Sequence, residues 1–258
     1  MEEYSEDLER PSWSQAATIS KEALICLTIG LTMTLILTSG KLEFLRFILH
    51  HFNILVHELG HCAWSWMMGY QAFPAFDFQH GGGMTMTFGR KPDWIIAGFI
   101  IFCLAGTAFK YRKYKMIAFG LLFICAFNIF AIKTYKFADV ITYGGHATEV
   151  IFGCVFIYRG LTNVSVHNAV ERVLYFFLGT FLLLDQYFFS RAIIHDAVRR
   201  AEYIEGKPGT LNDMVKLSRS QGISLDESLM YHLNFCILAA VLTYVVYVLS
   251  MRFYSTVE

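Results

Sequence analysis

Residues 52–68 read FNILVHELGHCAWSWMM, an apolar stretch with three ionisable side chains, His57, Glu58 and His61. A helix that crosses a bilayer needs about 20 mostly apolar residues, and ionisable groups at that depth are costly and usually functional. On a helix, His57 and His61 lie one turn apart on the same face, so their imidazoles can bind one Zn²⁺. Glu58 then lies beside the metal, where its carboxylate can accept a proton from bound water.

The composition favours a membrane protein. The 258-residue chain is 55% hydrophobic and 16% charged, whereas soluble domains carry about 25% charged residues, and its mean hydropathy is +0.46. We therefore expect an all-α polytopic protein with about six or seven transmembrane helices, integral to a lipid bilayer. The net charge of zero gives no reason to expect a nucleic-acid partner. The cysteines lie in apolar segments, none in a CxxC arrangement, so we expect neither disulfides nor cysteine ligands.

Apolar blocks predict the helices. They cover residues 22–38, 42–68, 94–109, 116–132, 139–158, 173–194 and 233–251. These blocks divide the chain into a solvated tail at 1–20, a membrane core at 21–195, a polar peripheral segment at 196–232, and a C-terminal transmembrane helix and tail at 233–258. Glycines inside the blocks indicate close helix packing, at positions 98, 106, 120, 153 and 179. Basic residues at 110–115 and 191–207 fall on opposite sides if all seven blocks cross, so charge does not decide the orientation.

Residues 71–88 read QAFPAFDFQHGGGMTMTF, which is typical of a β-hairpin. Apolar and polar residues alternate on both sides of Gly81-Gly82-Gly83, and glycines tolerate the positive φ angles of tight turns. Such a hairpin either pairs with an extended peptide along its edge or only covers the cavity that holds the metal.

The motif and its setting resemble a known family. An HELGH motif in a membrane helix, followed by a glycine-bearing hairpin and further apolar spans, is similar to the site-2-protease-type zinc metalloproteases of the M50 family. The M50B-like branch is the nearest in appearance, with the stretch HGGGMT at residues 80–85 and Ala97-Gly98 opening the next span. Asn212-Asp213-Met214 resembles a polar segment that follows the last core span in that branch, and we expect no chemical role for it.

The resemblance implies a zinc-dependent intramembrane endopeptidase that acts on a membrane protein or peptide. His57 and His61 would be metal ligands and Glu58 the general base. Better-studied members add an Asp ligand within an asparagine–proline and Leu-Asp-Gly pattern. This chain lacks that pattern, because Leu184-Asp185 is followed by Gln186 and no proline precedes it.

The third ligand is predicted to be His146, with Glu149 and Asp185 as alternatives. His146 and Glu149 are three residues apart and share a helix face, so one can bind the metal while the other orients a ligand. The preceding Gly144-Gly145 lets the backbone approach a neighbouring helix. Asp185 is a carboxylate in an apolar run and matches the ligand type of the family.

Two other functions remain open from the sequence. The chain could be a membrane zinc hydrolase that cleaves lipid amides, as alkaline ceramidases do, although those enzymes place an HxxxH motif on a late span. It could also be a non-catalytic protein that keeps the metal for stability or binds a partner. Glu58→Ala separates these cases, since an enzyme should lose activity while keeping its metal.

Overall fold

A computed structural model describes residues 19–39, 42–77, 82–89, 91–113, 115–163, 166–206 and 211–254. In this part of the chain the elements are α1 (Lys21–Thr38), α2 (Glu43–Met67), β1 (Gln71–Asp77), β2 (Gly82–Phe88), α3 (Trp94–Lys110), α4 (Lys115–Lys133), α5 (Phe137–Thr162), α6 (Ala169–His195), α7 (Ala197–Glu205), α8 (Asp213–Gln221) and α9 (Leu225–Tyr254). The predicted helical fold with a small hairpin after the motif helix is confirmed. The residues of the predicted tail before position 19 lie outside the described residues.

The number of membrane spans is not confirmed. Within the described residues, four helices are long and apolar enough to cross a membrane, namely α1, α5, α6 and residues Leu225–Met251 of α9. α3 and residues Ala118–Lys133 of α4 are apolar but shorter. α2 does not qualify, because polar and charged side chains interrupt its apolar run.

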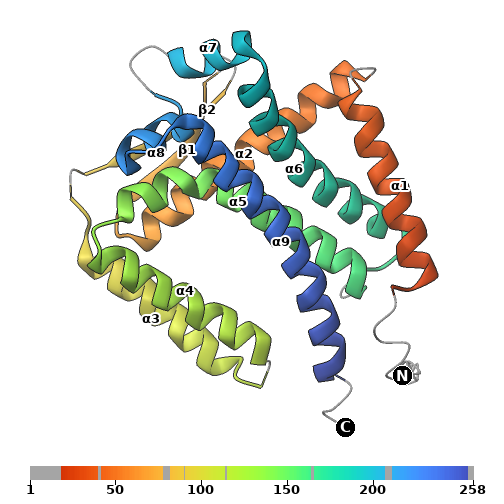
Figure 1. Ribbon diagram of the computed structural model, residues 1–258. Helices are drawn as coiled ribbons and strands as arrows, with labels where there is room; N and C mark the ends of the chain where they lie inside the picture. The colour runs from red at the N-terminus through yellow and green to blue at the C-terminus, as the bar shows by residue number, and fades with distance from the viewer. Residues whose placement is uncertain are drawn as a thin grey trace.

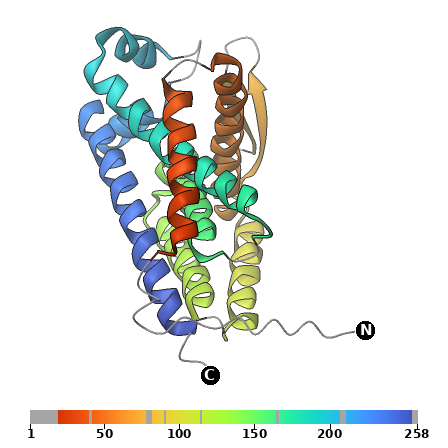
Figure 2. The same cartoon turned by 90° about the vertical axis from the view of Figure 1, so that its right-hand side faces the viewer.

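α5 and α6 lie side by side at the centre of the molecule (Figure 1). α2 packs across α5, α1 packs along α6, and α9 packs against both central helices. The α3–α4 pair lies to one side, and the view in Figure 2 shows that α1, α6 and α9 run through most of the height of the molecule. Figure 1 also places the start of α1 and the end of α9 on one side of the molecule and α7 and α8 on the other.

Small residues allow the central helices to approach closely. A Cβ added at Gly179 of α6 would lie 2.8 Å from the carbonyl oxygen of Gly153 in α5. A Cβ added at Gly30 of α1 would lie 2.7 Å from the backbone nitrogen of Phe177 in α6. The packing role predicted for Gly153 and Gly179 is therefore confirmed. It is wrong for the glycines at 98, 106 and 120, where an added Cβ meets no described atom within 4 Å.

The hairpin is a two-stranded antiparallel sheet. Its register runs from Gln71 opposite Phe88 to Asp77 opposite Gly82, and the strands pack against α2. Residues 78–81, which include part of the predicted glycine turn, lie outside the described residues.

α9 begins earlier than the hydropathy pattern predicts, at Leu225 rather than near residue 233. Ser224 and Glu227 form a capping box: Ser224 Oγ accepts from the Glu227 N–H at 3.2 Å, and Glu227 Oε2 accepts from the Ser224 N–H at 2.8 Å. Such a cap starts a helix with polar residues, which a search for apolar runs does not detect. The extra turns add His232 to α9.

Candidate metal centre

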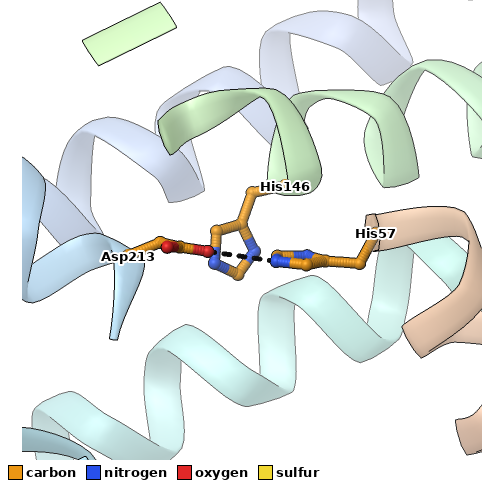
Figure 3. A group of neighbouring side chains, drawn as sticks. All are labelled: His57, His146 and Asp213. Carbon is orange, nitrogen blue, oxygen red and sulfur yellow. Dashed lines mark hydrogen bonds and ion pairs between the residues drawn. The ribbon is translucent and has the colours of Figure 1, made fainter. Parts of the chain in front are cut away.

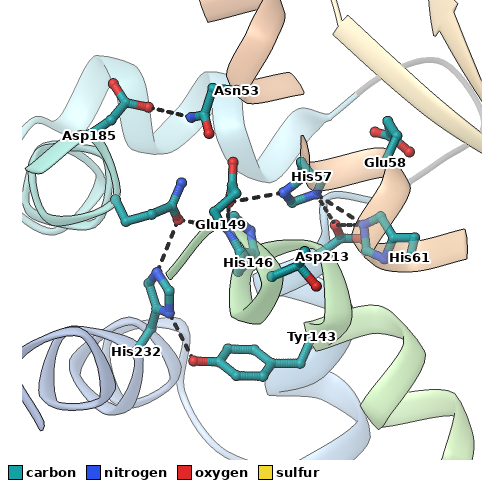
Figure 4. A network of polar contacts seen from close by, with 12 residues as sticks. Asn53, His57, Glu58, His61, Tyr143, His146, Glu149, Asp185, Asp213 and His232 are labelled. Carbon is teal, nitrogen blue, oxygen red and sulfur yellow. Dashed lines mark hydrogen bonds and ion pairs between the residues drawn. The ribbon is translucent and has the colours of Figure 1, made fainter. Parts of the chain in front are cut away.

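α2 presents His57 and His61 on one face, toward α5 and α8 (Figure 4). The two Nε2 atoms are 3.0 Å apart. Each Nδ1 atom contacts an acceptor on α5: Glu149 Oε2 lies 3.2 Å from His57 Nδ1, and the carbonyl oxygen of Ile141 lies 2.7 Å from His61 Nδ1. With both Nδ1–H groups donating to α5, both Nε2 lone pairs point to a common space.

A carboxylate from a distant part of the chain completes this group. Asp213 Oδ2, at the start of α8, lies 3.1 Å from His57 Nε2 and 3.0 Å from His61 Nε2. The three atoms therefore form a triangle with edges of 3.0 to 3.1 Å. We call His57, His61 and Asp213 the donor triangle.

The donor triangle suits a small divalent cation. Ligand atoms about 2.0–2.1 Å from a tetrahedral Zn²⁺ are separated by about 3.3 Å, close to the edges seen here. Two imidazole nitrogens and a carboxylate are also the ligand types that zinc accepts. The contact of His57 with Glu149 is the kind of outer contact that holds a ligating histidine in one tautomer and orientation.

Local contacts explain why Asp213 reaches this position. Asn212 Nδ2 donates to the carbonyl oxygen of Tyr203 at 2.7 Å, and the Tyr203 hydroxyl accepts from the Met214 N–H at 3.3 Å. These bonds attach the start of α8 to α7. Burial raises the pKa of the Asp213 carboxyl, but hydrogen bonds with the rings of His57 and His61 outweigh it and hold that pKa well below its ordinary value. The carboxylate is therefore ionised, as a ligand must be.

His146, the predicted third ligand, lies beside the donor triangle. His57, His146 and Asp213 each offer a ligand atom within 4.8 Å of the others (Figure 3), a looser set than the donor triangle. His146 is buried, its ring meets that of His57 edge to face at 4.6 Å, and its Nδ1 lies 2.9 Å from Gln186 Oε1. This arrangement leaves His146 Nε2 as the ring atom that can face a substrate or a metal ion.

A buried network continues behind His146. Gln186 Oε1 also lies 3.1 Å from His232 Nε2, and the Tyr143 hydroxyl lies 2.9 Å from His232 Nδ1. One consistent assignment has Tyr143 donating to His232, and His232 and His146 both donating to Gln186. Figure 4 shows this chain of contacts leading from α9 through α6 to the face of α5 that carries Glu149. Buried polar groups joined in this way hold their rings in fixed orientations.

Glu58 lies on the side of the hairpin. The Thr85 hydroxyl donates to Glu58 Oε2 at 2.6 Å, and a Cβ added at Gly83 would lie 2.6 Å from Glu58 Cδ. β2 therefore fits directly against this carboxylate, and only glycine at position 83 leaves the space that the carboxylate fills.

Glycines allow α2 and α5 to approach each other at the donor triangle. A Cβ added at Gly145 would lie 2.6 Å from the Nε2 atoms of both His57 and His61. One added at Gly144 would lie 2.8 Å from Cγ of Trp64, and one at Gly60 would lie 2.6 Å from the carbonyl oxygen of Gly144. The predicted role of Gly144-Gly145 in a close backbone approach is confirmed.

The other two predicted alternatives occupy different places. Glu149 contacts His57 Nδ1 and lies 3.3 Å from His146 Nδ1, so it sits behind the rings. Asp185 is not part of the donor triangle. It accepts from Asn53 Nδ2 at 2.7 Å, and Asn53 Oδ1 is buried without a hydrogen-bond partner among the described residues.

The donor triangle, Glu58, His146 and Asp185 border one cavity of about 330 Å³. Its lining comes from six elements and the loop before α8, and it includes His57, Glu58, His61, Gly83, Thr85, His146, Glu149, Asp185, Gln186, Tyr203 and Asp213. Imidazole nitrogens and carboxylates gathered in one cavity are the groups that can hold a divalent cation and accept a proton from a water molecule beside it.

From the sequence, no chemical role is expected for Asp213. The segment Asn212-Asp213-Met214 resembles one found in the M50B-like branch, but it lies in a polar stretch, where an acidic side chain is usually only solvated. Gln186, His232 and Tyr143 gave no signal at all, because only the packing of α5, α6 and α9 brings them together.

Among known protein families, the profile described as Peptidase M50B-like matches residues 24–246, which is most of the chain and contains every residue of the cavity. No curated protein and no solved structure matches the chain.

Proposed function

The chain belongs to the Peptidase M50B-like family, and from this premise we propose that it is a membrane-embedded zinc metalloprotease. Its substrates would be peptide bonds in or near transmembrane segments of other proteins. The observation that carries the proposal is the donor triangle with Glu58 beside it, because this set of groups supports metal-assisted hydrolysis.

The zinc ligands in this proposal are His57, His61 and Asp213. The support is geometric, since their donor atoms are 3.0 to 3.1 Å apart. This choice replaces His146 with Asp213 as third ligand. His146 Nε2 is then placed to contact the substrate carbonyl oxygen or the nucleophilic water, and Glu149 holds His57 in position.

The chemistry divides between the metal and the chain. A Zn²⁺ ion held by His57, His61 and Asp213 would supply Lewis-acid chemistry, which acidifies water and polarises a carbonyl group. Glu58 Oε1 accepts the proton of the attacking water and passes it to the leaving amine. The Thr85 hydroxyl donates to Glu58 Oε2 and so fixes the orientation of the carboxylate.

Two features support a peptide as the substrate. β2 lines the cavity through Gly82, Gly83, Met84 and Thr85, so its edge can pair with an extended chain by main-chain hydrogen bonds. The buried Asn53 Oδ1 can accept from a substrate N–H, because Asn53 Nδ2 is already bound to Asp185. A membrane helix would have to unwind to make these contacts.

The test is cleavage of a transmembrane peptide by purified protein in liposomes. Glu58→Gln should lower kcat at least a thousandfold while zinc content stays near one per chain. Glu205→Gln, at the exposed end of α7, is the matched control and should cleave like the wild type. A zinc chelator should abolish activity, and added Zn²⁺ should restore it.

The same preparations distinguish the other functions. Zinc-dependent release of a fatty acid from a lipid amide, without peptide cleavage, would favour the lipid-amide hydrolase. Bound zinc without turnover of either substrate, together with unchanged function in Glu58→Gln, would favour a non-catalytic role.

A further inference from the structure

A second and larger cavity, of about 630 Å³, lies apart from the donor triangle. It is formed where α1 ends, α2 begins, α6 ends and α7 follows, and Figure 1 shows these four helix ends gathered on one side of the molecule. The lining consists of Leu35, Leu37, Thr38, Ser39, Arg46, Phe181, Asp185, Phe188, Arg191, Ala192, His195 and Arg199. We call it the basic cavity.

Three arginines from three different helices meet in the basic cavity. Arg46 comes from α2, Arg191 from α6 and Arg199 from α7. Among the described residues, Arg199 has an ion pair with exposed Asp196 at 3.7 Å, and Arg191 donates to the Tyr187 hydroxyl at 3.1 Å. Three guanidinium charges therefore face two carboxylates, Asp196 and Asp185, which leaves the basic cavity with a net positive charge.

One acidic side chain, Asp185, lines the basic cavity. It accepts from Asn53 on the side of the first cavity, which it also borders, and its charge also interacts with that of Arg46. Guanidinium groups that outnumber the nearby carboxylates attract an anion. Guanidinium groups bind phosphate through two parallel hydrogen bonds, so phosphate suits this set well.

The rest of the lining is mostly apolar, apart from Thr38, Ser39 and His195. Leu35 and Leu37 lie in the last turn of α1, Phe181 lies at the middle of α6, and Phe188 lies nearer the end of α6. Both helices are candidate membrane spans, so their ends lie near the level of lipid headgroups. Basic pockets between transmembrane helices at that level are suited to anionic headgroups.

From this arrangement we propose that the basic cavity binds the phosphate group of an anionic phospholipid. The arginines hold the phosphate, and the leucine and phenylalanine walls contact the glycerol and the first part of the acyl chains. The proposal is independent of the proposed protease activity, because it uses none of the donor-triangle residues.

The experiment measures lipid binding to the full chain in a neutral detergent by titration calorimetry. The probes are a short-chain phosphatidylglycerol, the phosphatidylcholine with the same chains, and inorganic phosphate. Phosphatidylglycerol should bind at least tenfold more tightly than either of the other two. Equal binding of the two lipids, or equally tight binding of inorganic phosphate, would overturn the proposal.

Charge-removing variants locate the site. The triple variant Arg46→Gln, Arg191→Gln, Arg199→Gln should lose at least tenfold in phosphatidylglycerol affinity. A matched triple variant, Lys110→Gln, Arg112→Gln, Lys113→Gln, removes the same charge from the turn between α3 and α4 and should bind like the wild type. If the first triple variant does not fold, each single arginine variant should still weaken binding about threefold.

Two results would contradict the assignment directly. One is unchanged lipid affinity in every arginine variant. The other is displacement of phosphatidylglycerol by an acidic peptide that binds more tightly, which would make the basic cavity a substrate site rather than a lipid site.

Discussion

The backbone of Gly145 lies directly against the ring of His57, so that an added Cβ would come within 2.6 Å of Nε2. Since the neighbour is a ring held from behind by Glu149, it cannot move aside freely. Gly145→Ala should therefore push the ring out of the donor triangle and lower zinc affinity about 10–100-fold, the usual effect of disturbing ligand orientation.

The check is zinc content by mass spectrometry after dialysis against a weak chelator. Gly106→Ala in α3 is the control, because its Cβ would meet nothing within 4 Å of described structure, and it should keep full zinc. Equal zinc content in both variants would show that the close contact between α2 and α5 at Gly145 does not determine the positions of the two histidine rings.

Asp213→Asn should remove zinc, because an amide is a poor replacement for a carboxylate that touches both imidazoles. Asp185→Asn makes the same chemical change within the same cavity but outside the donor triangle, and it should keep zinc. Metal analysis of the two variants and of His146→Ala decides the third ligand. Loss of zinc in His146→Ala alone would identify His146, rather than Asp213, as the third zinc ligand.

Thr85→Val removes the hydroxyl that donates to Glu58 Oε2 at 2.6 Å while keeping the shape of the side chain. The loss of a hydrogen bond to a charged group should lower kcat about tenfold and leave zinc content unchanged. Thr87→Val, at an exposed position on the same strand, is the control in the peptide-cleavage assay. A fall in zinc content with Thr85→Val would show that Thr85 also supports the metal site, and not only the orientation of Glu58.

Tyr143→Phe leaves the buried His232 Nδ1 without its donor. An unsatisfied buried acceptor costs about 1–3 kcal/mol, so the midpoint of thermal unfolding should fall. Cleavage should slow as His146 loses its fixed orientation, with zinc retained. Tyr247→Phe, in a hydrophobic cluster farther along α9, should change neither the cleavage rate nor the zinc content. Equal effects of the two variants would show that the buried network does not orient His146.

The sequence was sufficient to predict the apolar helices, the hairpin and the part of the candidate site that lies on α2, namely His57, Glu58 and His61. Long apolar blocks and the i, i+4 spacing of His57 and His61 are local signals, and the predicted boundaries of α1 to α6 lie within about four residues of the observed ones. α7 and α8 lie in the polar segment, for which the apolar pattern predicted no boundaries. α9 was placed late because its first turns are polar and are started by the Ser224–Glu227 cap.

The position of Asp213 in the candidate site depends on long-range contacts that no local sequence pattern encodes. His61 and Asp213 are 152 residues apart, and Asp213 is recognisable as a partner only once α7 and α8 have folded over the end of α5. Asp185 looked like the better candidate because its run is apolar, yet the turn of α6 directs its carboxylate to Asn53. The rotation of α6 about its axis determines where the Asp185 carboxylate points, and hydropathy carries no information about that rotation.

The long separation between the histidine pair and Asp213 has a consequence for biosynthesis. A ribosome releases the HELGH segment long before it has made α8 and α9, and domains form as their parts emerge. During that interval the nascent chain has the two histidines but not yet the carboxylate of the donor triangle. If the chain is the protease proposed above, its hydrolytic capacity would therefore be withheld until Asp213 has been made, which would protect neighbouring proteins at the insertion machinery from premature cleavage.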